Sequence, residues 1–112
     1  MQLSFTGIYA AKSDCSTELL EQHIVKLIHH MTGLESEIPH VLETRVHAQR
    51  ASATPDADTH VEIEITVSDD SMENAVSRAD RHIKEAINAV AERSGGQTCL
   101  QRISTECEVV SR

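Results

Sequence analysis

Residues 60–68, HVEIEITVS, decide the fold class because their side chains alternate between polar and apolar. A period of two predicts a β-strand. One apolar face and one polar face favour an antiparallel sheet with one side on the core and the other in water. The apolar face carries Val61, Ile63, Ile65 and Val67, and the polar face carries Glu62, Glu64, Thr66 and Ser68.

The segment that follows this strand has helical periodicity. Asp70 precedes Glu73 by three residues, a pattern similar to the capping box at a helix start. Apolar residues then recur every three or four positions until the pair Gly95-Gly96, which is typical of a helix end. We therefore predict an amphipathic helix that ends at about Arg93, with a stripe formed by Met72, Val76, Ala79, Ile83, Ile87 and Val90.

An earlier helix is predicted over about residues 16–31. Its apolar stripe contains Leu20, Ile24, Leu27 and Met31, and Gly33 stands where a glycine commonly ends a helix. Residues 34–39 are predicted as a connector with room for a short strand.

Three further segments alternate in the manner of strands. Residues 2–8 predict a strand that ends at Gly7 or soon after, and residues 40–49 predict another. The small polar segment ASATPDADT at residues 51–59 predicts a loop. The tail predicts a weaker final strand, with Ile103, Thr105, Cys107 and Val109 on one side.

These elements predict an α+β two-layer sandwich, with two helices on one antiparallel sheet. The predicted order is β-α-β-β-α, with a further short strand allowed before the second helix. If the tail is a strand, the order becomes β-α-β-β-α-β, which is ferredoxin-like. We place a single domain at residues 1–96 and a C-terminal tail at residues 97–112.

Composition narrows the cellular context. The 112 residues are 39% hydrophobic, and no apolar stretch approaches the roughly 18 residues that cross a bilayer. The start of the chain lacks the pattern of a signal peptide, so we expect no membrane association and a cytoplasmic location. Three cysteines without close pairing argue against a disulfide framework, although a Cys99–Cys107 bridge stays open.

Charge is unevenly distributed along the chain. The net charge is −8, and residues 34–70 hold nine acids against two arginines. The helices are nearly neutral, so their cations can form a local basic patch, with an ordinary surface of mixed charge as the alternative. The candidate patch comprises Lys26, Arg78, Arg81 and Lys84, with His23 and His82 when these are protonated.

Motifs of catalysis and metal binding are missing from the sequence. No HExxH, CxxC or GxSxG occurs, and Glu62 and Glu64 lie on the face of a strand predicted to be wet. A carboxylate pair there lacks the pocket that general acid–base catalysis requires. We therefore expect no enzyme activity, no catalytic residue, no metal and no cofactor.

Two motifs resemble the ribosome hibernation-promoting factor family, which includes the sigma-54 modulation proteins. The opening MQLSFTG at residues 1–7 is similar to the family's MQLxITG, and DDSMENAV at residues 69–76 is similar to its helix start. The resemblance spans about residues 1–92. It implies a β-α-β-β-β-α fold that binds small-subunit rRNA through basic residues on both helices. Lys26 matches a basic position of the family, and His23 and His82 stand where the family often has lysine.

The chain departs from that family at several positions. Glu85 and Ala89 replace basic residues, Glu73 replaces the tyrosine of the helix start, and the lysine-rich helix end is missing. Each lost phosphate contact weakens binding to RNA.

Two functions follow as expectations. The first is a ribosome-associated, translation-silencing factor of stress response, which binds rRNA through His23, Lys26, Arg78, Arg81, His82 and Lys84. The second is a non-catalytic interaction domain, which either forms a homodimer by pairing an edge strand of its sheet or binds a basic protein partner on the acidic sheet face. A metabolic enzyme on a ferredoxin-like scaffold is a third alternative.

Overall fold

Six elements form a computed structural model that describes residues 1–12, 15–50, 59–93, 95–96 and 98–110. In chain order they are β1 (Gln2–Ala11), α1 (Thr17–Glu37), β2 (Val41–Arg50), β3 (Thr59–Ser68), α2 (Met72–Arg93) and β4 (Leu100–Val110). Residues 51–58, most of the predicted loop, lie outside the described residues. No helix in the described part is long and apolar enough to cross a membrane.

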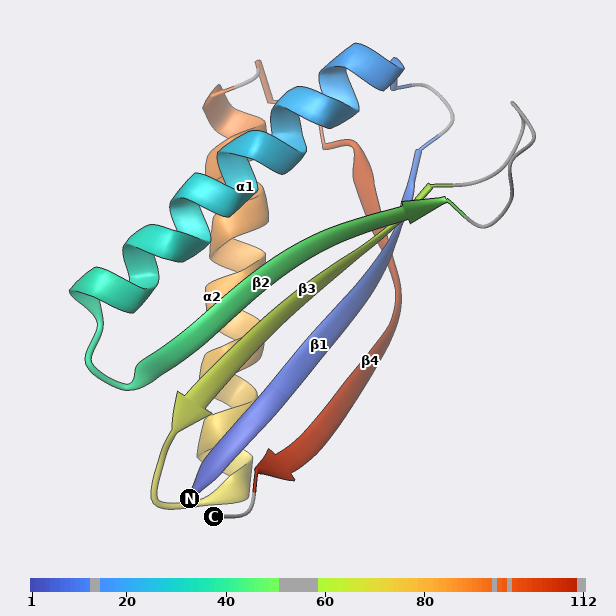
Figure 1. Ribbon diagram of the computed structural model, residues 1–112. Helices are drawn as coiled ribbons and strands as arrows, with labels where there is room; N and C mark the ends of the chain where they lie inside the picture. The colour runs from blue at the N-terminus through green and yellow to red at the C-terminus, as the bar shows by residue number, and fades with distance from the viewer. Residues whose placement is uncertain (13–14, 51–58, 94, 97, 111–112) are drawn as a thin grey trace.

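The strands form one antiparallel sheet in the order β2-β3-β1-β4. Figure 1 shows α1 and α2 on one side of this sheet, with β4 at the edge farthest from α1. The two-layer α+β prediction is confirmed, and the arrangement is the ferredoxin-like β-α-β-β-α-β. The tail therefore supplies the fourth strand, whereas no further strand precedes α2 within the described residues.

The core lies between the sheet and the helices. The four apolar side chains of β3 are completely inaccessible to solvent, as the alternation in residues 60–68 predicts. α1 packs on β2, and α2 packs on β1 and β3. Burying each large aliphatic side chain contributes about 1.5–3 kcal/mol before the cost of ordering the chain. The helix layer contributes Leu20, Leu27, Met31, Ala75, Ala79, Ile83, Ala86 and Val90.

The first helix is longer than the sequence predicted. It continues through Gly33 to Glu37, and the backbone N–H of Ile38 bonds to the carbonyl of Leu34. Gly33 is thus a helix-interior residue, and the predicted connector at residues 34–39 is mostly helical. Leu34 explains the extension because it packs on the core and continues the apolar stripe. Pro39 cannot continue the helical hydrogen bonds, and the helix ends just before it.

The first strand also runs past the predicted end at Gly7 to Ala11. A Cβ placed on Gly7 would lie 2.8 Å from Cε1 of Tyr9, so the tyrosine ring occupies the space above the glycine. Glycine within a strand commonly marks such a close approach. Gly7 therefore accommodates Tyr9 instead of ending the strand.

Cys15 and Cys99 form a disulfide, which corrects the expectation of unpaired cysteines. The two residues are 84 positions apart in sequence, and their Cα atoms lie 5.7 Å apart. Sheet pairing brings them together, because Lys12 at the end of β1 donates a backbone hydrogen bond to Cys99 beside β4. Cys107 is exposed and is not part of a disulfide, so the Cys99–Cys107 alternative is also wrong.

Candidate functional site

Two histidines of the predicted RNA-binding set are buried. His23 lies in the core-facing side of α1, and His82 lies in that of α2. Burial lowers the pKa of both imidazoles, and the positive charge of Lys26 lowers that of His23 further. Because their pKa values lie below the ordinary 6.5, both rings are mainly neutral at pH 7.

His82 also has a structural partner. Its Nε2 lies 2.9 Å from Nε2 of His40, and the ring centroids are 5.1 Å apart. One imidazole donates its ring N–H, and the other accepts it through a ring nitrogen without a proton. The pair joins α2 to the turn before β2, so it stabilises contact between two elements.

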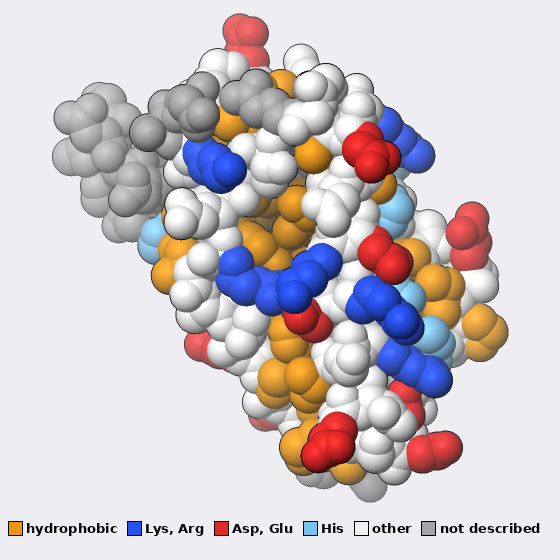
Figure 2. Space-filling view, turned by 180° about the vertical axis from the view of Figure 1, so that it is seen from behind, with side chains coloured by type: hydrophobic (Ala, Val, Ile, Leu, Met, Phe, Trp, Pro, Cys, Tyr) orange, Lys and Arg blue, Asp and Glu red, His pale blue; other side chains and the backbone are white. Residues whose placement is uncertain are grey.

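Cations on α2 are partly neutralised by neighbouring acids. Arg78 lies 3.2 Å from Asp69, and Lys84 lies 3.0 Å from Asp80. Arg81 is exposed, and Lys26 on α1 is half-buried. Figure 2 shows the Lys and Arg side chains across the middle of the helix face, with acidic side chains among them. This face is therefore a surface of mixed charge.

A polar cluster joins three elements between α2 and the start of β4. Arg102 Nη2 and Nε donate hydrogen bonds of 2.7 and 3.2 Å to the Tyr9 hydroxyl. Arg102 Nη1 also lies 2.6 Å from Asp80 Oδ1, and Lys84 Nζ lies 3.0 Å from Oδ2 of the same carboxylate. Of these four residues, sequence reasoning selected only Lys84.

A β-bulge brings Arg102 into this cluster. Ile8 pairs with Ser104 but Tyr9 pairs with Arg102, so Ile103 is an extra residue in β4. Such a bulge reverses the side on which the following side chains lie. Arg102 consequently shares the helix side of the sheet with Tyr9. The sequence offered one signal for this contact, since a tyrosine buried in an apolar strand commonly needs a polar partner.

The cluster keeps its expected charges at neutral pH. Burial would raise the pKa of Asp80, but the hydrogen bonds and charges of Arg102 and Lys84 lower it below the ordinary value. Burial raises the pKa of Tyr9, which Arg102 only partly offsets. The tyrosine thus stays protonated, and the cluster holds two cations and one anion.

A hollow of about 320 Å³ lies beside this cluster. Ile87 and Leu100 provide apolar surface, Asn88 stands on α2, and the remaining lining residues are Tyr9, Lys84 and Arg102. Figure 2 shows hydrophobic surface exposed between the charged side chains on this face.

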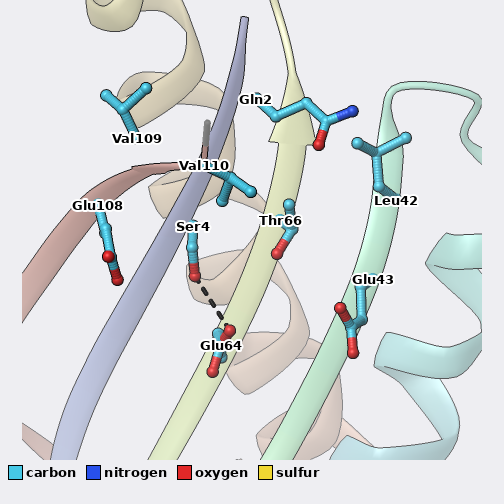
Figure 3. A pocket seen from close by; sticks show the side chains of 9 residues that line it. All are labelled: Gln2, Ser4, Leu42, Glu43, Glu64, Thr66, Glu108, Val109 and Val110. Atoms are coloured by element: carbon cyan, nitrogen blue, oxygen red, sulfur yellow. Dashed lines mark hydrogen bonds between the residues drawn. The ribbon is translucent and has the colours of Figure 1, made fainter. Parts of the chain in front are cut away.

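The opposite face of the sheet is acidic. Glu43, Glu64 and Glu108 line a depression of about 510 Å³, where Ser4 Oγ donates a 3.0 Å hydrogen bond to Glu64. Figure 3 shows these side chains and the bond between Ser4 and Glu64. Strand register places five glutamates on this face: Glu43, Glu62, Glu64, Glu106 and Glu108.

The two edges of the sheet differ. On β2, the Glu35 carboxylate accepts hydrogen bonds from the backbone N–H and the hydroxyl of Thr44, so α1 covers part of that edge. On β4, every side chain from Ile103 to Val109 is exposed. Thr105 and Cys107 pair with Gly7 and Phe5 and so belong to the helix side of the sheet, yet they are exposed. An uncovered edge strand can pair with another chain.

Comparison with known proteins supports the fold alone. No protein-family model matches the chain, and no curated protein sequence is similar to it. A dimeric ferredoxin-like protein of unknown function from Bacteroides fragilis has a TM-score of 0.60 at 11% identity, over 96% of this chain and 92% of that one.

Two other solved structures share the architecture. A dimeric ferredoxin-like protein of unknown function from Thermobifida fusca has a TM-score of 0.57 at 14% identity, over 98% of this chain and 92% of that one. A hydroxynitrile lyase from Passiflora edulis has a TM-score of 0.51 at 15% identity, over 97% and 94%. The same fold therefore occurs in an enzyme and in proteins of unknown function, so the fold by itself does not indicate a function.

Proposed function

We propose that this protein is a self-association domain that forms a homodimer by pairing β4 with β4 of a second copy. The observation that carries the proposal is the exposed strand edge from Ile103 to Val109. Its apolar residues Ile103 and Val109 are 53% and 43% exposed. The Bacteroides and Thermobifida structures, which share this fold, are described as dimeric, and this supports a dimer as such.

Charge favours one register for this pairing. If two antiparallel β4 strands are centred on Thr105, Glu106 of each copy lies opposite Ser104 of the other. A centre at Glu106 would oppose the two copies of that residue, and a centre at Cys107 would oppose Glu106 and Glu108. Like charges placed directly opposite destabilise a strand pair, so the Thr105 register is the most favourable of the three.

Charge also disfavours the competing dimer, in which two open sheet faces pack together. Each such face carries five glutamates, with Arg45 of β2 among them. Burying carboxylates against carboxylates costs more than their contacts return. The acidic face therefore remains toward solvent in the proposed dimer.

Sedimentation equilibrium tests the proposal directly. We expect a concentration-dependent dimer, and Thr105→Asp should raise its Kd by about tenfold or more because it places two carboxylates at the two-fold axis. Thr32→Asp, an exposed position on α1, is the matched control and should leave the Kd unchanged. A wild-type protein that stays monomeric over the whole concentration range would refute the assembly.

Cross-linking distinguishes the two dimer geometries. In a Cys107→Ser background, Thr105→Cys should form an intermolecular disulfide under mild oxidation, whereas Thr6→Cys on the open face should not. The reverse result would replace edge pairing with face-to-face packing.

Ribosome binding stays a separate, untested prediction. Arg81 is an exposed cation of α2, and salt-sensitive co-sedimentation of the protein with small ribosomal subunits would support this prediction. Loss of pelleting in Lys26→Ala/Arg81→Ala would place the contact on the helix layer.

A further inference from the structure

We propose that the hollow between α2 and β4 binds a small organic carboxylate with an apolar body. This hollow is lined by Tyr9, Lys84 and Arg102, among others, and lies within a single chain. Binding there does not depend on the proposed dimer.

The charge around the hollow is opposite to that of the whole chain. The chain has a net charge of −8, yet this hollow is bordered by two cations and one acid. Lys84 is the more exposed cation, with 62% of its side chain accessible, so it can turn toward a bound anion. Pairing with Asp80 holds both cations near the opening.

The hollow also contains an unused hydrogen-bond donor. The Tyr9 hydroxyl accepts both bonds from Arg102, and its own proton has no acceptor among the described residues. The residue is only 3% exposed, which makes an unused donor there costly. The two Arg102 bonds polarise the O–H group and strengthen it as a donor. A carboxylate oxygen is the acceptor that best matches a protonated phenol beside cations.

The rest of the hollow has an apolar lining. Ile87 and Leu100 flank the polar groups, and a free inorganic anion would leave this surface unused. A volume of about 320 Å³ is near the lower end of known ligand pockets, about 300–1,000 Å³. The combination of few polar groups and apolar walls selects a short-chain acid over phosphate.

The experiment uses hexanoate as the probe and follows amide chemical shifts of the whole chain by NMR. We expect shifts centred on Ile87, Asn88 and Arg102 with saturation at millimolar hexanoate. Hexanamide, which has the same body without the charge, should bind at least tenfold more weakly. Inorganic phosphate should also bind at least tenfold more weakly.

Variants separate the contributions of the polar groups. Lys84→Gln and Tyr9→Phe should each weaken hexanoate binding at least fivefold, whereas Arg81→Gln, exposed on the same helix, should not change it. Because Lys84 is exposed, we expect Lys84→Gln to keep the fold, and the NMR spectrum reports folding in each variant. The proposal is overturned if hexanoate gives no localised shifts, if hexanamide or phosphate binds equally well, or if Lys84→Gln has no effect.

Discussion

At the scale of single residues, two histidines of the helices, His23 and His82, lie in the interior of the fold. Both rings are mainly neutral at pH 7, and a single hydrogen bond joins His82 to His40. Sequence reasoning treated both as surface cations because a histidine in an amphipathic pattern is compatible with either side of the helix. Whether each histidine faces solvent or the core depends on how its helix packs on the sheet, and both face the core.

These buried histidines predict acid sensitivity. Their folded pKa values are lower than the ordinary 6.5, so the unfolded chain binds protons more readily. The contribution of these neutral histidines to folding stability is therefore complete above about pH 6.5. It is lost as the pH falls from there through their folded pKa values. Replacing the titrating ring in His82→Gln should reduce the fall in unfolding free energy between pH 7 and pH 5, measured by urea denaturation. An equally steep fall would assign the acid sensitivity to other groups.

Gly7 supports a second prediction at this scale. Gly7→Ala should lower the free energy of unfolding by about 1–3 kcal/mol, because the new methyl group meets the Tyr9 ring at 2.8 Å. In a Tyr9→Leu background the same change should cost clearly less, and a double-mutant cycle measures that coupling. Additive effects would show that the ring does not constrain the glycine.

At the scale of elements, the helix and strand ends were the least predictable features. The alternation in residues 60–68 specified β3, but β1 and α1 both continue through a glycine. Glycine commonly ends a helix by adopting a positive φ, as Gly95 and Gly96 do after α2. Within the described residues Gly7 and Gly33 have no positive φ.

Gly33 tests this distinction. A Cβ at this position would meet no atom within 4 Å, and the residue lies inside α1. Gly33→Ala should therefore raise the free energy of unfolding by about 0.5–1 kcal/mol, since alanine loses less backbone entropy in a helix. Thermal and urea denaturation measure the change. Destabilisation would instead indicate the helix-ending conformation that the sequence first suggested.

At the scale of the whole molecule, the Cys15–Cys99 disulfide joins the start of α1 to the start of β4. It closes a segment that contains most of the chain. Such a cross-link restricts the unfolded ensemble, and its removal commonly costs about 2–5 kcal/mol.

We expect Cys15→Ser/Cys99→Ser to lower the free energy of unfolding by about 2–4 kcal/mol relative to the oxidised protein. Thiol titration of the denatured wild type should detect one thiol, from Cys107, and the Cys107→Ser variant should detect none. Detection of three thiols without reductant would contradict the disulfide. Equal stability of the double variant and the oxidised wild type would contradict a stabilising contribution of the disulfide.

The sequence alone determined the layers of this protein, because periods of two and of about 3.6 residues specify which side of each strand or helix avoids water. It also led us to predict Lys84 as a contact for rRNA, which remains a prediction. Only the tertiary structure decided that Tyr9, Asp80 and Arg102 meet, since they come from three elements and Arg102 reaches the others through a bulge. The same holds for Cys15 and Cys99. Contacts between distant segments depend on register and strand order, and local periodicity carries no information about either.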